Sequence, residues 1–258
     1  MRSFLINLGA TFLNFYTFLK DYLYFSCEII KSVLKFNLFN KAIFTVFIRQ
    51  VYFTGVQIIP VYIVVSLIFG IALVGFLSKQ LIEFGIYNEL GKILVLLILR
   101  ELGPIVTVIL LALRSSTAVG AEISVMKLSK EIDTLLYFEI DPMRYLYLPR
   151  VFAGLTCMVS LSILFSFISI TGGYLLLSFN LGITFDYLLS LIFDYISLSD
   201  VAAFLYKTVM FGFFVMSMPI YSALWVKKAN TEIPISLLKG MMRLFFAILF
   251  VEITGAFI

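Results

Sequence analysis

Charged side chains within apolar segments are the residues best placed to do chemistry in this chain. Arg100 and Glu101 are neighbours in one apolar segment, and Lys207 and Glu252 each stand in another. On insertion scales, a charged side chain near the centre of a bilayer costs about 2.5–3.5 kcal/mol, so such residues usually face a bundle interior or a cavity. Two interpretations of Arg100 and Glu101 stay open. In the first, the two residues are structural, and they neutralise each other or pair with another span. In the second, they are functional, and they line a cavity or a gate.

Helix geometry separates the expected roles of these four residues. Glu101 lies eight residues after the expected helix start at Ile93, which is about 12 Å along the axis. That depth is near the middle of a hydrocarbon core about 30 Å thick. Adjacent residues point about 100° apart on a helix, so we expect Arg100 and Glu101 to serve different roles. Lys207 and Glu252 are expected to extend toward the membrane interfaces.

The absence of histidine and the placement of the cysteines exclude the common kinds of catalytic and metal site. The chain has no histidine, which removes Ser-His-Asp and Cys-His catalysis, the HExxH zinc motif and most zinc sites. Its two cysteines, Cys27 and Cys157, are far apart, and Cys157 lies inside an apolar segment. This arrangement predicts neither a disulfide framework nor a cysteine metal site. We therefore expect no catalytic residue, no metal site and no cofactor.

The polar segment 115–150 has a pattern of its own. Ser129 can cap a short helix that carries apolar residues on one face and charged residues elsewhere. These two groups are Ile132, Leu135 and Leu136, and Lys130, Glu131 and Asp133. Asp141 and Pro142 then predict the N-cap and first residue of another helix. Docking of a soluble partner and simple packing at the membrane interface both remain open for the first of these helices.

The composition indicates that lipid surrounds much of the chain. Hydrophobic residues make up 62% and charged residues 13% of the sequence, and the mean hydropathy is +1.09. Soluble domains have roughly 45–50% and about 25% of these classes. We predict an all-α polytopic membrane protein with about five spans, at residues 50–78, 93–114, 150–177, 201–225 and 233–257.

The remaining segments complete the expected architecture. Residues 1–45 form an N-terminal helical segment, and residues 46–258 form the membrane domain. Polar residues recur at helical spacing between Asn7 and Glu28 on an otherwise apolar segment, through Thr11, Asn14 and Asp21. This stripe is typical of a helix that lies in the membrane interface or packs on the protein's own flank. Residues 178–200 are expected to form a loop.

The basic residues predict the orientation of the spans. With the N-terminus in the cytoplasm, twelve Lys and Arg residues lie inside, including Lys227 and Lys228, and only Lys79 and Lys92 lie in the two outer loops. This asymmetry favours a cytoplasmic N-terminus. Because the basic residues are spread thinly between apolar segments, their excess predicts no nucleic-acid partner.

Four motifs occur in a fixed order along the chain. They are RELGP at Arg100–Pro104, AEISVMK at Ala121–Lys127, KEIDTL at Lys130–Leu135 and DPMRYLYLPR at Asp141–Arg150. Together they resemble the signature of the MlaE permease family, the membrane subunits of lipid-transporting ABC systems that work with MCE-domain proteins. The resemblance covers roughly residues 46–257.

The resemblance implies a homodimer of permease subunits on two ATPase subunits, beneath a ring of MCE domains, with a small STAS-type accessory subunit as a further partner. Lipid, of the phospholipid class, would occupy a cavity between the protomers, with Arg100 and Glu101 as candidate cavity or gate residues. The segment 130–138 would be a coupling helix that receives ATP-driven motion. Its candidate coupling residues are Lys130, Glu131, Asp133 and Leu135.

Two other functions stay open on the residues alone. A proton-coupled secondary transporter would use intramembrane carboxylates, with Glu101 and Glu252 as candidates, although five spans without an internal repeat argue against it. A passive scaffold for another complex is the second. The expected location is a bacterial inner (cytoplasmic) membrane, with the plastid inner envelope as the alternative.

Overall fold

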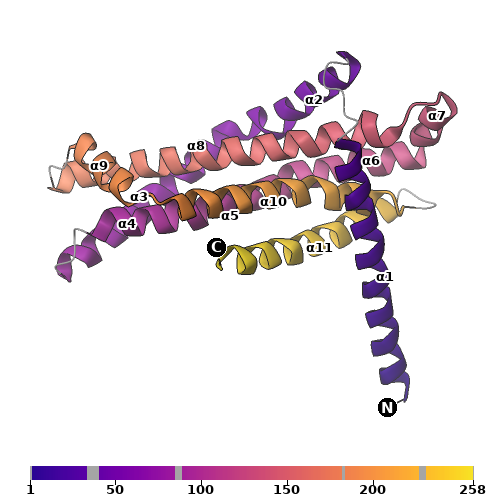
Figure 1. The fold of residues 1–258 in the computed structure, drawn as a ribbon, viewed down its shortest axis with the longest axis horizontal. Coiled ribbons are helices and arrows are strands. Elements are labelled where there is room, and N and C mark those ends of the chain that lie inside the picture. Colours follow the sequence, from indigo (N-terminus) through magenta and orange to yellow (C-terminus); the bar gives the residue numbers. More distant parts are fainter. Residues whose placement is uncertain (1, 34–40, 85–88, 182–183, 227–230, 258) are drawn as a thin grey trace.

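Long apolar helices dominate the chain. The computed structural model describes residues 2–33, 41–84, 89–181, 184–226 and 231–257, and every regular element in these ranges is helical. Five helical stretches in them are long and apolar enough to cross a membrane: Lys41–Leu81, Gly91–Leu128, Met143–Leu175, Leu198–Ala223 and Glu232–Gly255. The predicted all-α, five-span architecture is confirmed. The five stretches lie side by side along the long axis of the molecule (Figure 1).

Each span is built from one or more helices. The first contains α2 (Lys41–Thr54), η1 (Val56–Ile58) and α3 (Ile59–Glu83). The second contains α4 (Leu90–Leu94), η3 (Val95–Leu102), α5 (Gly103–Leu111), η4 (Ala112–Ser116) and α6 (Thr117–Leu128). The third contains η5 (Met143–Tyr147) and α8 (Leu148–Leu181). The last two are α10 (Leu198–Ala223) and α11 (Glu232–Gly255), while α1 (Arg2–Val33), α7 (Glu131–Tyr137) and α9 (Phe185–Tyr195) lie outside the spans.

The second span is longer than the sequence predicted. Its helix does not end near Arg114 but continues to Leu128, because the serines of this stretch pack inside the bundle. Ser124, for example, is fully buried and donates a hydrogen bond from Oγ to the carbonyl of Gly120 at 2.7 Å. A serine that satisfies its hydroxyl on its own helix does not interrupt a buried span.

The expected loop at 178–200 is wrong in three respects. Residues 178–181 belong to α8, Phe185–Tyr195 form the helix α9, and residues 198–200 belong to the first turn of α10. Ile192 of α9 is buried in a cluster with Val95 and Ile98 of η3, so this connection packs against the bundle. The apolar residues between the aspartates of this segment are the signal for that helix.

Three segments of the second and third spans, η3, η4 and η5, are π-helical. The first of them ends where Pro104 follows. Proline has no N–H to donate to the carbonyl four residues before it, and the N–H of Gly103 bonds instead to the carbonyl of Ile98, five residues back. Such wider turns recur at functional sites in helices. Here the wider turn carries Arg100 and Glu101.

Small residues let α3 and α8 approach closely. A side chain at Gly70 would collide with the backbone of Ser169, and one at Gly173 would collide with Val74. Ser169 Oγ also donates a hydrogen bond to the carbonyl of Ser66 at 3.0 Å. Close backbone contact and interhelical hydrogen bonds hold helices together where lipid removes the hydrophobic driving force.

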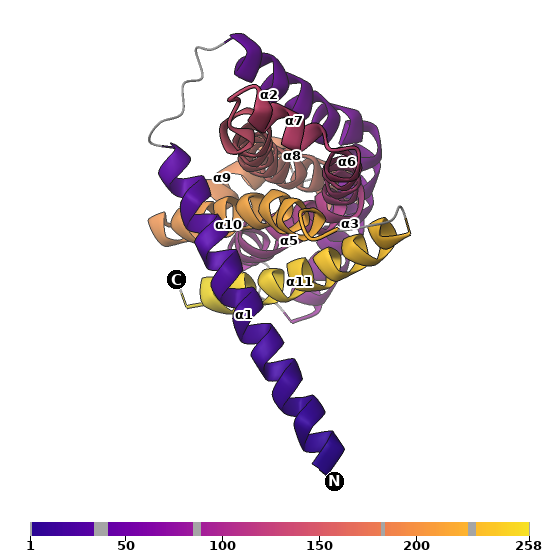
Figure 2. The ribbon, with the colours of Figure 1, turned by 90° about the vertical axis from the view of Figure 1, so that its right-hand side faces the viewer.

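Viewed from the end of the bundle, α10 is central, with α2 on one side and α11 on the other (Figure 2). The largest core cluster accordingly includes Phe211, Val215 and Met216 of α10 together with Met158 and Phe165 of α8. The central helix therefore contacts most of the others and fixes their relative positions.

The N-terminal helix α1 crosses the spans at the end that also carries α7 (Figure 1). Tyr22, Phe25 and Ile29 are buried on one face, whereas Asp21 and Glu28 are exposed. This spacing of three and four confirms an amphipathic helix whose second half packs on the protein's flank. The side chains of Asn7, Thr11 and Asn14 lie outside the described residues, as do Lys227 and Lys228.

Candidate functional site

Five charged residues inside the spans are joined in one network, which we call the charge cluster. It links η3, α10 and α11 through salt bridges. Its members are Arg100, Glu101, Asp200, Lys207 and Glu252. Pairing of this kind is what an intramembrane charge requires, since a lone ion in a low-dielectric interior is far more costly.

Lys207 is the centre of the charge cluster. Its side chain is 0% exposed, and its Nζ donates hydrogen bonds to Glu101 Oε2 and, at 2.5 Å, to Glu252 Oε1. The expectation that Lys207 and Glu252 extend to the membrane interfaces is therefore wrong. Two carboxylates on neighbouring helices offset the desolvation of the ammonium group, so the lysine stays inside.

Arg100 joins the cluster from the same helix as Glu101. Its Nε lies 3.6 Å from Glu101 Oε1, and its Nη1 lies 3.4 Å from Asp200 Oδ1. Arg100 and Glu101 each have a partner on α10, Asp200 for the arginine and Lys207 for the glutamate, so both pair with another span. Their separate roles stay a prediction.

Local sequence features position these groups. Asp200 and Lys207 are seven residues apart, or about two turns, and thus share a face of α10. Asp200 is also the N3 residue of a capping box with Ser197, which begins α10. Gly255 at the end of α11 leaves room for the lysine stem, since a Cβ there would lie 2.6 Å from Lys207 Cε.

The charge cluster has three carboxylates and two cations, so one negative charge remains when all five groups are ionised. Its buried atoms include Glu252 Oε2, which has no hydrogen-bond partner among the described residues. The side chains of Glu101 and Glu252 are 27% and 25% exposed. The arrangement can hold three helices together and present carboxylate oxygens to a polar group beside the bundle.

The second candidate site is α7, which lies between the second and third spans. Ile132 is buried and Leu135 packs against the core, so these two residues anchor the helix. Leu136, Tyr137 and Phe138 are exposed, with Tyr137 at 87%. The helix thus exposes apolar side chains, and it lies at one end of the spans (Figure 1).

The N-terminus of α7 differs from the prediction. Ser129 ends α6, and Lys130 is the N-cap of α7, with a left-handed backbone at φ 59°. The Ser129 hydroxyl donates to Glu131 Oε1 at 2.9 Å, and Lys127 pairs with Asp133 at 3.2 Å. Because the chain reverses within two residues, no serine N-cap contact forms, and side-chain pairs tie α7 to α6 instead.

The helix that follows α7 begins as predicted. Asp141 Oδ1 accepts a hydrogen bond from the N–H of Met143 at 2.9 Å, which is an N-cap contact. Farther along, the buried Arg150 pairs with Glu122 of α6 at 2.7 Å and donates to the carbonyl of Leu146. This ion pair gives Glu122 a structural role, because it compensates the charge of a buried guanidinium group.

Two members of the charge cluster, Asp200 and Lys207, were missed from the sequence as site residues, and Glu252 was named only as a carboxylate of the alternative transporter. A usable signal was present, because a lysine within a 26-residue apolar helix needs a partner. The seven-residue spacing of Asp200 and Lys207, with a carboxylate in the last span, completes that signal.

Comparison with known proteins places the chain among permeases. The family model described as Permease MlaE matches residues 47–258. The chain is 31% identical to a probable ABC transporter permease protein of Rickettsia typhi over 204 residues, which covers 79% of this chain and 77% of that protein.

Two further relatives carry names that state a role or a compartment. The intermembrane phospholipid transport system permease protein MlaE of Haemophilus influenzae is 38% identical over 132 residues, or 51% of each chain. The chloroplastic protein TRIGALACTOSYLDIACYLGLYCEROL 1 of Arabidopsis thaliana is 27% identical over 165 residues, which covers 64% of this chain and 47% of that protein.

Proposed function

This chain belongs to the MlaE permease family, and from that premise we propose that it is the membrane subunit of an ABC transporter that moves phospholipids between membranes. The observation that carries the proposal is the family match over residues 47–258, which spans all five membrane helices except the start of the first. Relatives named as an ABC transporter permease and as a phospholipid transport permease support both halves of the proposal.

The chain's own part in transport is passage of lipid, and ATP hydrolysis belongs to a separate ATPase subunit. That subunit docks on α7, where Leu136, Tyr137 and Phe138 form an exposed apolar surface beside Lys130 and Glu131. Ile132 and Leu135 connect this surface to the core, so a displacement of α7 by the ATPase is transmitted to α6 and α8. Asp133 strengthens the connection through its pair with Lys127.

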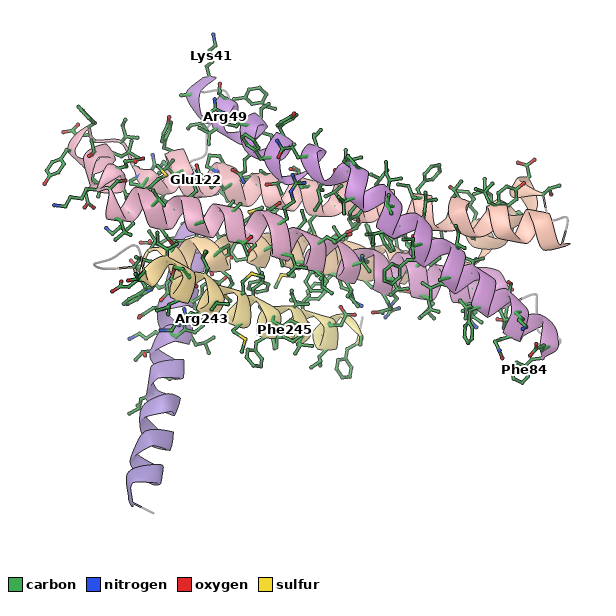
Figure 3. The ribbon with its side chains drawn as sticks, turned by 180° about the vertical axis from the view of Figure 1, so that it is seen from behind. Lys41, Arg49, Phe84, Glu122, Arg243 and Phe245 are labelled. Carbon is green, nitrogen blue, oxygen red and sulfur yellow. The ribbon has the colours of Figure 1, made fainter. Side chains whose placement is uncertain are left out.

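Membership of the family supports three further partners in this proposal. They are a substrate-binding protein with MCE domains, a small STAS-type accessory subunit and a second copy of this chain. An exposed apolar face on α11 suits either lipid or a second copy, and Figure 3 shows Phe245 on its outer side. The charge cluster lines the lipid cavity or its gate, with Arg100 and Glu101 as the residues that meet the lipid.

The protein is a multi-pass membrane protein, and its proposed location is a bacterial inner membrane, with the plastid inner envelope as the alternative. The N-terminus is cytoplasmic. The crossing of α1 at the end that carries α7 supports this orientation, because a helix along the cytoplasmic interface and an ATPase-docking helix must lie on one side (Figure 1).

The test is co-purification of the permease with its co-expressed ATPase subunit. Reversing Glu131 and Asp133 to lysine should lower ATPase recovery severalfold while membrane insertion is unchanged. Glu89→Lys is the matched control, because Glu89 is an exposed acidic residue at the N-cap of α4, far from α7 in the sequence. Unchanged ATPase recovery and transport in the double variant would remove α7 from the docking role.

The same preparation separates the other candidate functions. A proton-coupled transporter would move lipid in response to a pH gradient without the ATPase, and a passive scaffold would support no transfer at all. The comparisons give neither alternative support, and the pairing of Glu101 and Glu252 with Lys207 gives both carboxylates a stabilising partner.

A further inference from the structure

A cleft of about 500 Å³ lies between α1, the end of α10 and the first half of α11. It is lined by residues of both charges and by hydroxyl groups, unlike the lipid-facing surfaces of the spans. The lining residues that matter here are Asp21, Ser222, Trp225, Glu232, Lys239 and Arg243. Figure 3 shows Arg243 on α11 where that helix meets α1.

Arg243 supplies a half-buried cation to this cleft. Its guanidinium carbon lies 3.9 Å from the centre of the Phe18 ring on α1. Within the described part of the chain, no carboxylate forms a salt bridge with it. A cation that is partly removed from water and stacked on a ring still has donors to offer an anion. Lys239 adds a second positive charge one turn away.

Ser222 supplies an independent sign of a ligand. The residue is 3% exposed, it lines the same cleft, and its hydroxyl has no hydrogen-bond partner among the described residues. A buried hydroxyl left unpaired costs roughly 1–3 kcal/mol, and buried polar groups are nearly always satisfied. An acceptor oxygen inside the cleft would remove that cost.

The acidic residues define the ligand further. Asp21 on α1 and Glu232 on α11 share the lining with the two cations, so the cleft carries both signs. A simple anion would meet repulsion from the carboxylates, whereas a group with a phosphate and an ammonium would satisfy both. We propose that this cleft binds the headgroup of an amine-bearing phospholipid, its phosphate at Arg243 and Ser222 and its ammonium at Asp21.

The position of the cleft fits a lipid that stays in its leaflet. Trp225, the only tryptophan in the chain, lines it and is half exposed, as is usual at the level of lipid headgroups. Arg243 is nine residues before Glu252 on α11, or about 13 Å along the axis, so the cleft is separate from the charge cluster. The bound lipid joins α1 to the bundle and is not the transported molecule, so the proposal does not rest on the transport function.

Trp225 also provides the test. The purified full-length chain in detergent is titrated with dioctanoylphosphatidylethanolamine while tryptophan fluorescence is recorded. Parallel titrations use dioctanoylphosphatidylglycerol, glycerophosphoethanolamine and inorganic phosphate. We expect a saturable change with the first lipid, about tenfold weaker binding of the second, which lacks the ammonium, and no saturation with phosphate. Glycerophosphoethanolamine should compete, since it carries the whole headgroup.

Variants tie the signal to the named contacts. Arg243→Gln should weaken phosphatidylethanolamine binding about tenfold, and Ser222→Ala should weaken it with little effect on folding. Asp21→Asn should remove the preference over phosphatidylglycerol, and because Asp21 is exposed this change leaves the fold intact. Lys92→Gln, at an exposed lysine of α4, is the control and should bind as the wild type does. Equal responses to both lipids, a saturable response to phosphate alone, or full binding by Arg243→Gln and Ser222→Ala would each overturn the proposal.

Discussion

Lys207 Nζ in α10 lies 2.5 Å from Glu252 Oε1 in α11, and the same ammonium group bonds Glu101 of η3. One fully buried lysine thereby joins α10 and α11 to η3, which lies about a hundred residues earlier in the sequence. The cost of burying an ion is offset only while its partners remain, and removing one member of a buried pair typically costs about 3–5 kcal/mol. This contact therefore makes the charge cluster a determinant of stability as well as a candidate site.

Removal of the lysine should show this dependence. Lys207→Met leaves Glu101 and Glu252 without their shared cation, and we expect a loss of about 3–5 kcal/mol in the free energy of unfolding. The double change Lys207→Met with Glu252→Gln should recover part of the loss, because Glu101 still has Arg100. Thermal unfolding in detergent measures both variants. Equal stability of the single variant and the wild type would show that the pair contributes nothing.

Glu101→Gln separates a structural role from a role in transport. The amide keeps the shape of the carboxylate, and Lys207 retains Glu252 as a partner, so we expect a loss of stability under about 2 kcal/mol. Reconstituted lipid transfer should nevertheless fall severalfold if Glu101 lines the lipid cavity. Stability and transfer are measured on one preparation. A stable variant with wild-type transfer would defeat the cavity assignment.

The topology is tested by reporter fusions. A fusion after Asn180, at the end of α8, should report the outer side, and one after Ala229, between α10 and α11, should report the cytoplasm. The reason is the concentration of Lys and Arg on the side of the N-terminus. If both fusions report the same side, α10 does not cross the membrane.

Packing of α1 on the bundle should weaken at alkaline pH, because Tyr22 ionises there. Burial raises the pKa of Tyr22 from 10.0 to about 12, although a 2.6 Å hydrogen bond with Ser217 acts in the opposite direction. Because the folded protein favours the neutral phenol, this stabilisation is fully present below pH 10 and is lost as the pH rises through about 12. Two pKa units correspond to roughly 2.7 kcal/mol.

The comparison variant for this effect is Tyr22→Phe, which cannot ionise. Between pH 10 and about 12, the wild type should lose its stability advantage over the variant, as measured by thermal unfolding at a series of pH values. An advantage that is constant across this range would contradict the prediction.

Residue type and order were sufficient for the architecture and the family. The five spans follow from the length and hydropathy of the apolar segments, because a helix must satisfy its own backbone groups in lipid. The segment 130–138 was identified by its pattern of apolar and charged residues, and the pair Asp141-Pro142 predicted the N-cap contact of Asp141. These features are local, so each can be deduced from a few neighbouring residues.

Pairing between helices was decided by the tertiary structure alone. Whether Lys207 reaches an interface or a carboxylate depends on the rotation of α10 against η3 and α11, which is set by packing across the bundle and not by any local pattern. The cleft beside α1 arises in the same way, from segments some two hundred residues apart. The sequence determined which side chains are available, because composition and periodicity are properties of a single segment. The fold determined which of these side chains meet, because a contact depends on the relative positions of several segments.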